Sequence, residues 1–142
     1  MITCVVDASV AAKWFLSQHE EYSEQAVSIL AACAAGTTQV LVPDHFFAEM
    51  GSVLWKSVRG KRISSDGAFN ALQSIKDLDL AVFSSANLLE EALRIALDHN
   101  RTVYDSLYVA LAVRSSTDFI TADEHLANAL AAYLPVKWLG AF

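Results

Sequence analysis

The fold is decided by the stretch Ile2-Thr-Cys-Val-Val6, which is followed at once by Asp7-Ala-Ser9. A short apolar run rich in β-branched side chains predicts a buried strand over residues 2–6. Asp7 ends this run, and the apolar pattern of Ala8–Leu16 predicts a helix that begins directly after it. A buried strand that leads straight into a helix is typical of the first half of a strand–helix–strand unit.

Further strands and helices alternate along the rest of the chain. The predicted strands cover residues 40–42, 80–83, 118–121 and 136–138. The predicted helices cover residues 22–35, 44–58 (with Asp44 as its N-cap), 64–75, 87–98, 103–113 and 124–132. This order predicts an α/β fold of three layers, α/β/α, with a central, mostly parallel sheet of four to five strands and helices on both faces. No linker or repeat interrupts residues 1–142, so we expect a single domain.

The composition excludes several classes of protein. Of the 142 residues, 54% are apolar and 18% are charged, which excludes a disordered chain. The mean hydropathy of +0.34 is high for a small protein and suggests apolar surface that is covered by a partner or by a second copy of the chain. The net charge of −6 argues against a protein that coats DNA, although a local basic patch could still bind nucleic acid.

The sequence predicts a cytoplasmic protein without a membrane segment. Its longest uncharged stretch, residues 25–43, is interrupted by Gly36-Thr-Thr-Gln39, and neither part could span a bilayer. The N-terminal apolar run has no basic residues before it and ends at Asp7, unlike a signal peptide. Cys4 and Cys33 lie in predicted apolar elements and are interpreted as core residues rather than as a disulfide.

Four acidic residues interrupt or end apolar stretches that should be buried: Asp7, Glu49, Asp105 and Asp123. A buried carboxylate is strongly disfavoured unless it is paired or binds a cation. Asp7 and Asp123 follow two predicted strands, and ligands bind at the strand ends of open parallel sheets. Converging carboxylates without thiolate or imidazole favour Mg²⁺ or Mn²⁺, and such a set is typical of phosphodiester hydrolysis.

Helix capping is the alternative interpretation of three of these acids. Asp7 and Asp123 precede predicted helices and could be N-caps, while Thr102 and Asp105 have the spacing of a capping box. Glu49 lies one to two turns inside a predicted helix, and capping does not explain it. Capping and metal binding are compatible, because a helix N-terminus favours the ionised carboxylate that a metal needs.

Four segments, in this order, resemble the motifs of the PIN-domain nucleases. They are Val6-Asp7-Ala-Ser9, Phe47-Ala-Glu49-Met-Gly-Ser-Val-Leu54, Tyr104-Asp105-Ser-Leu-Tyr-Val-Ala-Leu111 and Phe119-Ile-Thr-Ala-Asp123. Within that family the chain is most similar to the VapC-type toxins of bacterial and archaeal toxin–antitoxin pairs. Each motif alone is weak, but the ordered set matches along the whole chain in spacing and length.

The resemblance implies a Mg²⁺- or Mn²⁺-dependent endoribonuclease that acts as a toxin and hydrolyses RNA with metal-activated water. The implied metal ligands are Asp7, Glu49, Asp105 and Asp123. Ser9, two residues after the first acid, would assist as a catalytic residue, and Thr121 matches a similar polar position. The family also implies a homodimer and a small antitoxin that packs in an apolar groove, with higher hetero-oligomers of the two proteins.

Six basic residues are candidates for binding the RNA backbone: Lys13, Lys56, Arg59, Lys61, Arg62 and Arg101. Four of the ten basic residues fall between positions 56 and 62. This cluster is either a patch for phosphates or a set of solvated cations at a helix C-terminus. Trp14, Trp55 and Trp138 are interpreted as core or interface residues, because no neighbouring pattern supports base stacking.

Two other functions are open from the sequence alone. A non-catalytic protein-interaction module would use its four acids only as helix caps. A phosphatase of the haloacid dehalogenase type would also place an Asp after the first strand. It needs a second Asp two residues later, however, where this chain has Ser9. The sequence indicates neither the RNA that is cut nor the number of metal ions.

Overall fold

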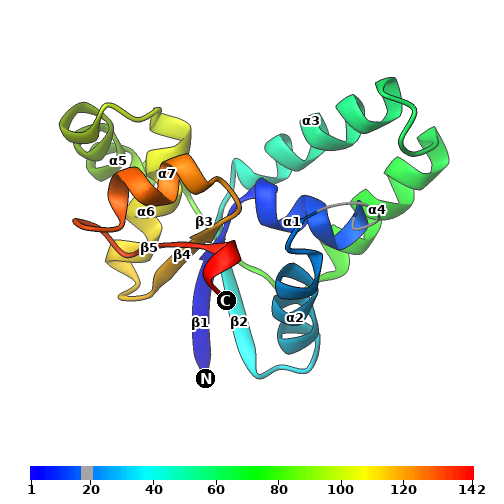
Figure 1. Cartoon of the computed structure of the whole chain (residues 1–142), viewed down its shortest axis with the longest axis horizontal. Helices are drawn as coiled ribbons and strands as arrows, with labels where there is room; N and C mark the ends of the chain where they lie inside the picture. Colours follow the sequence, from blue (N-terminus) through cyan, green and yellow to red (C-terminus); the bar gives the residue numbers. More distant parts are fainter. Residues whose placement is uncertain (17–20) are drawn as a thin grey trace.

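The computed structural model describes residues 1–16 and 21–142. Within these residues, five parallel strands form one sheet in the order β3-β2-β1-β4-β5 (Figure 1). The strands are β1 (Ile2–Val6), β2 (Thr38–Pro43), β3 (Ala81–Phe83), β4 (Asp118–Thr121) and β5 (Val136–Trp138). The predicted α/β fold with a mostly parallel sheet is confirmed, and every pairing in the sheet is parallel.

Helices connect the strands. In the described part of the chain they are α1 (Ala8–Phe15), α2 (Ser23–Ala34), α3 (Phe46–Arg59), α4 (Ser65–Asp77), α5 (Ser85–His99), α6 (Val103–Arg114) and α7 (Glu124–Leu130), with a final 3₁₀ turn, η1 (Leu139–Ala141). All the predicted helices are present, with ends shifted by two residues at most. The sequence pattern does not predict η1.

Helices cover both faces of the sheet, as predicted. The helix α6 packs across β2, β1 and β4, and α5 packs against α6 as an outer helix. The helices α1 and α2 lie on the other side of β1 and β2 (Figure 1). Because both faces are covered, Cys4, Val5 and Val6 are buried in succession instead of alternating with exposed residues. Residues Ser106–Ala112 of α6 are likewise buried on every side of the helix.

The start of α3 differs from the sequence prediction. The Asp44 N–H still donates to the Phe83 carbonyl of β3 at 2.8 Å, residues 44 and 45 form a turn, and the helix begins at Phe46. Asp44 is therefore not its N-cap, and the Asp44 carboxylate instead accepts a hydrogen bond from the Ser85 hydroxyl at 2.5 Å. As a result Glu49 lies in the first turn of α3, nearer the positive end of the helix dipole than expected.

The helices α3 and α4 form a hairpin, here called the α3–α4 arm, that projects from the body of the molecule (Figure 1). The arm is attached at its base, where α3 contacts α1. Both of its helices bury apolar side chains, which are Met50 and Leu54 in α3 and Ala71 and Ile75 in α4. The remaining faces of the arm are exposed to solvent along most of its length.

Nothing among the helices of residues 1–16 and 21–142 combines the length and the apolarity that a bilayer crossing needs. Cys4 and Cys33 are both buried and unbonded, which confirms their interpretation as core residues. Burial raises the pKa of the Cys4 thiol to about 11, so this thiol is protonated and inert at neutral pH.

Two glycines give opposite predictions for the same substitution. An added Cβ at Gly140 would lie 2.4 Å from the Trp138 ring, whereas at Gly51, inside α3, nothing lies within 4 Å. We expect Gly140→Ala to lower the free energy of unfolding by about 1–3 kcal/mol through overpacking. Gly51→Ala should raise it by about 0.5–1 kcal/mol, because alanine favours the helix. Urea unfolding followed by circular dichroism measures both, and changes of the same sign would contradict the described packing of Trp138.

Candidate active site

The four candidate acids lie where strands end and helices begin. Because β1 lies between β2 and β4, the chain leaves β1 at a topological switch point of the sheet. Asp7 follows β1 and Asp123 follows β4, while Glu49 and Asp105 lie in the first turns of α3 and α6. Their charges act on one another: Glu49 acts on Asp7 and Asp105, and Asp123 acts on Asp105. The structure therefore brings all four predicted acids to one region.

Asp7 is the most deeply buried of these carboxylates, with 8% of its surface exposed. Its Oδ1 accepts hydrogen bonds from the Ser9 hydroxyl at 2.5 Å and the Val10 N–H at 3.3 Å, and its Oδ2 accepts one from the Thr121 hydroxyl at 2.7 Å. Burial raises the pKa of Asp7 to about 6, although the hydrogen bonds lower it, and the charge of Glu49 adds to the rise. The bond from Val10 makes Asp7 the N-cap of α1, as the capping interpretation predicts.

Ser9 and Thr121 connect the end of β1 to the end of β4. The Ser9 hydroxyl accepts a hydrogen bond from the Ala122 N–H at 3.0 Å, and the Thr121 hydroxyl accepts one from the Asp123 N–H at 3.1 Å. The two hydroxyl oxygens are 3.4 Å apart. Each hydroxyl therefore donates to Asp7 and accepts from the backbone next to Asp123, which fixes these two acids relative to each other.

Glu49 is held by two side chains that the sequence does not single out. The Tyr108 hydroxyl donates to Oε1 of Glu49 at 2.7 Å, and Nε2 of His45 lies 3.0 Å from the same oxygen without the alignment of a hydrogen bond. Burial raises the pKa of Glu49, but the contacts with His45 and Tyr108 outweigh burial and leave this pKa below its ordinary value. Burial and the bond to Glu49 raise the pKa of Tyr108, so its hydroxyl stays a donor.

Asp105 and Asp123 lie nearer the surface. Thr102 is the N-cap of α6 and accepts a hydrogen bond from the Asp105 N–H at 3.1 Å, as the capping-box spacing predicts. Burial raises the pKa of Asp105, and the charges of Glu49 and Asp123 raise it further. Asp123 is exposed, and its carboxylate accepts the Leu126 N–H at 3.1 Å as the N-cap of α7. Capping thus describes part of the geometry, but it does not explain why these negative charges lie close to one another.

Two hollows border the acids. The larger, of about 550 Å³, is lined by residues of α3 and α6 that include Glu49, Lys56 and Asp105. The smaller, of about 240 Å³, is lined by residues that include Ser9, Lys13, Lys56 and Arg62. Lys56 borders both hollows, so a positive charge lies on α3 between the two hollows.

The six candidate basic residues differ in their distance from the site. Three of them line the smaller hollow beside Ser9, namely Lys13, Lys56 and Arg62. Arg101 precedes α6, and its charge lowers the pKa of Asp105, against the larger effect of burial. Arg59 lies further out on α3, where its guanidinium is 5.0 Å from the centre of the Trp55 ring. Lys61 follows α3 in a left-handed conformation (φ 58°) and lines neither hollow.

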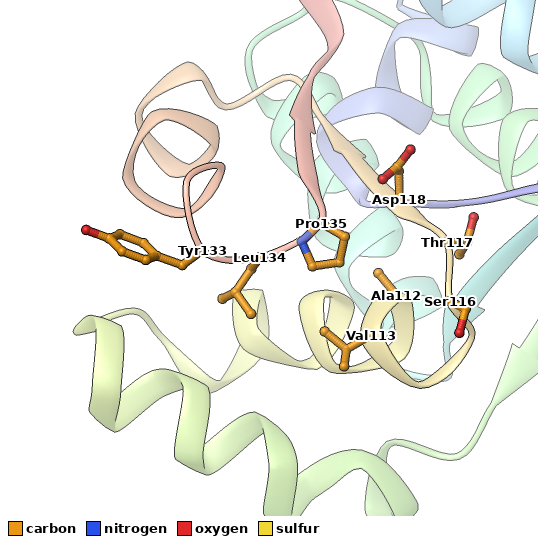
Figure 2. A pocket seen from close by; sticks show the side chains of 8 residues that line it. All are labelled: Ala112, Val113, Ser116, Thr117, Asp118, Tyr133, Leu134 and Pro135. Atoms are coloured by element: carbon orange, nitrogen blue, oxygen red, sulfur yellow. The ribbon is translucent and has the colours of Figure 1, made fainter.

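A cavity of similar size, about 560 Å³, lies at the opposite end of β4 (Figure 2). Its lining includes Thr117 and Asp118 at the start of β4 and Leu134 and Pro135 before β5. Asp118 is the one charged side chain among the described residues that line it, and its carboxylate lies 2.9 Å from Nζ of Lys137. This cavity offers no converging acids, so we assign the candidate site to the carboxyl ends of the strands.

The donor set fits a hard divalent cation that keeps much of its water. All four acids supply oxygen, and the Glu49 charge raises the pKa of both Asp7 and Asp105, a repulsion that a cation would relieve. Among residues 1–16 and 21–142, however, no three His, Cys, Asp or Glu side chains converge closely enough to enclose an ion. Mg²⁺ retains several waters and is usually bound through only one or two carboxylates.

Solved structures share the fold of this chain. A crystal structure of the Pyrobaculum aerophilum protein PAE2754 has a TM-score of 0.69 at 20% identity and covers 99% of this chain and 85% of that one. Mycobacterium tuberculosis VapC20, a sarcin–ricin loop cleaving toxin, has a TM-score of 0.63 at 16% identity, with coverages of 92% and 95%. Rickettsia felis VapBC2, bound to a DNA fragment from their promoter, has a TM-score of 0.63 at 10% identity, with coverages of 96% and 98%. At these identities the similarity concerns the fold.

The sequence comparison is more specific. Residues 4–130 match the PIN domain family. The chain is also 35% identical over 127 residues to Ribonuclease VapC3 of Pyrobaculum aerophilum, an alignment that covers 87% of this chain and 92% of that protein. The family match over residues 4–130 includes all four acids. The chain therefore belongs to the PIN-domain family, and within it is related to the VapC ribonucleases.

Proposed function

We propose that this protein is an endoribonuclease that requires Mg²⁺ or Mn²⁺ and acts as the toxin of a toxin–antitoxin pair. The observation that carries the proposal is the placement of four carboxylates where strands end and helices begin, two of them with a pKa raised chiefly by burial and further by the charge of Glu49. A divalent cation bound between these carboxylates would relieve the repulsion between their negative charges. The similar VapC3 is a ribonuclease, which supports RNA as the substrate.

The four acids would bind the ion with different strengths, depending on how deeply each is buried. Asp7, Glu49 and Asp105 would hold the ion, partly through the waters that it retains, and the exposed Asp123 would be a fourth, weaker contact at the rim. When bound, the ion supplies a Lewis acid and a water of lowered pKa for attack on the phosphodiester.

Other side chains of the site hold the ligands in place. The hydroxyls of Ser9 and Thr121 orient the Asp7 carboxylate, and the Tyr108 hydroxyl orients Glu49. Because the Ser9 hydroxyl also accepts a backbone N–H, we assign Ser9 a positioning role instead of direct contact with substrate. Such outer contacts fix the direction in which each ligand oxygen points.

Basic residues beside the acids would bind the RNA phosphates. Lys13, Lys56 and Arg62 line the hollow next to Ser9. The net charge of the chain is −6, so this local positive charge is needed to bring a polyanion to an acidic site.

A second copy of the chain and an antitoxin are the proposed protein partners in the cytoplasm. The helix α5 exposes Leu89, Leu93 and Leu97 at one-turn spacing, with 48%, 48% and 75% of their surfaces accessible. An exposed apolar stripe of this kind supports a homodimer. The VapBC2 assembly of the same fold supports a complex with a VapB-type antitoxin and higher hetero-oligomers.

Removal of single acids should abolish RNA cleavage. We expect Asp7→Asn, Glu49→Gln and Asp105→Asn each to lower the cleavage rate by more than about 100-fold, because changes outside the ligand shell of a metal already cost about 10–100-fold. Asp123→Asn should cost about 10-fold, because this carboxylate lies at the rim. Gel assays on a structured RNA with Mg²⁺ measure these rates, and EDTA should stop cleavage until Mg²⁺ or Mn²⁺ is added in excess.

The matched control is Asp118→Asn, which alters an acid at the opposite end of β4 and should leave cleavage unchanged. Cleavage that persists in EDTA, or purified protein that binds no divalent ion in calorimetry, would overturn the proposal. A non-catalytic interaction module would instead keep its cellular effect in all four acid variants.

The buried Asp7 predicts a pH dependence of stability in the metal-free protein. Its pKa is about 6 in the folded protein, against an ordinary 3.8, so the folded state binds more protons than the unfolded state between these values. The Asp7 contribution to stability should therefore fall by roughly 3 kcal/mol as the pH rises from about 4 to about 6, and then stay constant. Asp7→Asn removes this loss.

Thermal unfolding in EDTA between pH 4 and pH 8 tests this sign. The stability of Asp7→Asn relative to the wild type should increase with pH across that window. Added Mg²⁺ should then stabilise the wild type more than the variant, since it binds the folded site. A stability difference that does not change with pH would show that Asp7 ionises normally.

A further inference from the structure

Trp55 and Arg59 extend one wall of the larger hollow along α3. Ala48 and Ser52, one turn apart on this helix, line the hollow that contains Glu49. Trp55 follows three residues after Ser52 and Arg59 four residues after Trp55, so both share this face and continue it toward the outer end of α3. With a rise of about 1.5 Å per residue, Trp55 lies about 9 Å along the helix from Glu49.

Trp55 is not a core residue of this chain, which excludes one of the two interpretations that its sequence suggests. Within this chain its side chain is 58% exposed, whereas Trp14 is buried. The Arg59 guanidinium lies 5.0 Å from the centre of the Trp55 ring, a cation–π contact. An exposed indole beside a stacked guanidinium has the two groups that single-stranded nucleic acid requires, an aromatic face for a base and a cation for the phosphate.

The surroundings of Trp55 favour RNA over a protein partner. Its neighbours on this helix face, Ser52 and Arg59, are polar, and the adjacent Lys56 lines both hollows. The centre of a protein interface is depleted in lysine, whereas phosphates are attracted to such a cluster. Phe69, an exposed aromatic on α4, has no cation over its ring in the described part of the chain.

We propose that Trp55 and Arg59 form a base-stacking platform for single-stranded RNA, a few nucleotides from the phosphate that is cleaved. This inference rests on the proposed ribonuclease function. The strand would pass from the acids along α3, beside Lys56, to the platform. The separation of about 9 Å corresponds to two or three nucleotides at a stacked spacing of about 3.4 Å. Because every base has an aromatic face, the platform would add affinity without selecting a sequence.

Binding and cleavage test the platform separately. The Asp7→Asn protein, which should bind RNA without cutting it, is titrated with a short single-stranded oligoribonucleotide at fixed salt, with fluorescence anisotropy and tryptophan quenching as readouts. In this background we expect Trp55→Leu to weaken binding by roughly 5- to 150-fold and to remove the quenching. Trp55→Phe should retain most of the affinity, because it keeps an aromatic face. Phe69→Leu, on the other helix of the arm, is the matched control and should bind like the parent.

In the active protein, Trp55→Leu should raise KM while kcat stays within about twofold, since the platform lies away from the reacting phosphate. The platform proposal is overturned if Trp55→Leu leaves the affinity for the oligoribonucleotide unchanged. It is also overturned if the Asp7→Asn protein itself binds no oligoribonucleotide. A Trp55→Leu protein that sediments as a smaller species at unchanged RNA affinity would assign Trp55 to a protein interface instead. If RNA binds through Trp55 but is never cut, the platform proposal stands and the proposed ribonuclease function is overturned. Failure of one proposal can therefore be distinguished from failure of the other.

Discussion

The Asp7 carboxylate ends β1, the middle strand of the sheet, at a place where burial disfavours its charge. The surrounding residues meet this constraint with two hydroxyls and one backbone N–H. The same hydroxyls accept backbone N–H groups from the loop after β4, so the contacts that satisfy Asp7 also set the path of the chain toward Asp123. The geometry of the site and the pairing of β1 with β4 are therefore parts of one hydrogen-bond network.

Most of the fold follows from local pattern. The strand over residues 2–6 and the buried helix from Val103 are marked by continuous apolar runs, and both appear where the sequence places them. The start of α3 could not be predicted in this way. Asp44 is of a residue type that often caps helices, but its N–H bonds to β3 and it lies in the turn before the helix. That bond exists only in the assembled sheet. Tertiary hydrogen bonding thus moved the helix start by two residues.

The acids of the site were predictable because each interrupts or ends an apolar stretch. The side chains that hold Glu49 in place were not predicted. Tyr108 lies one turn after Asp105 on a helix that is apolar nearly all round, so in the sequence it resembles one more core aromatic. Only the approach of α3 to α6 shows that its hydroxyl bonds Glu49. His45 could have been noticed from its spacing of four residues before Glu49, a pair that faces one side of a helix. Trp55 is exposed because the α3–α4 arm projects from the rest of the molecule. A local sequence pattern does not predict that projection.

A single rigid helix carries both Glu49 and Trp55. In the proposed function, a ligand of the cleavage site and a contact for a distant base would therefore be held at a constant separation, and the cut would fall at a set number of nucleotides from the stacked base whatever the RNA sequence. One residue inserted between them would turn Trp55 by about 100° around the axis as well as move it outward. If α3 binds RNA as proposed, the length of this segment would matter as much as the identity of its acid, because it would set the distance between the cleaved phosphate and the stacked base.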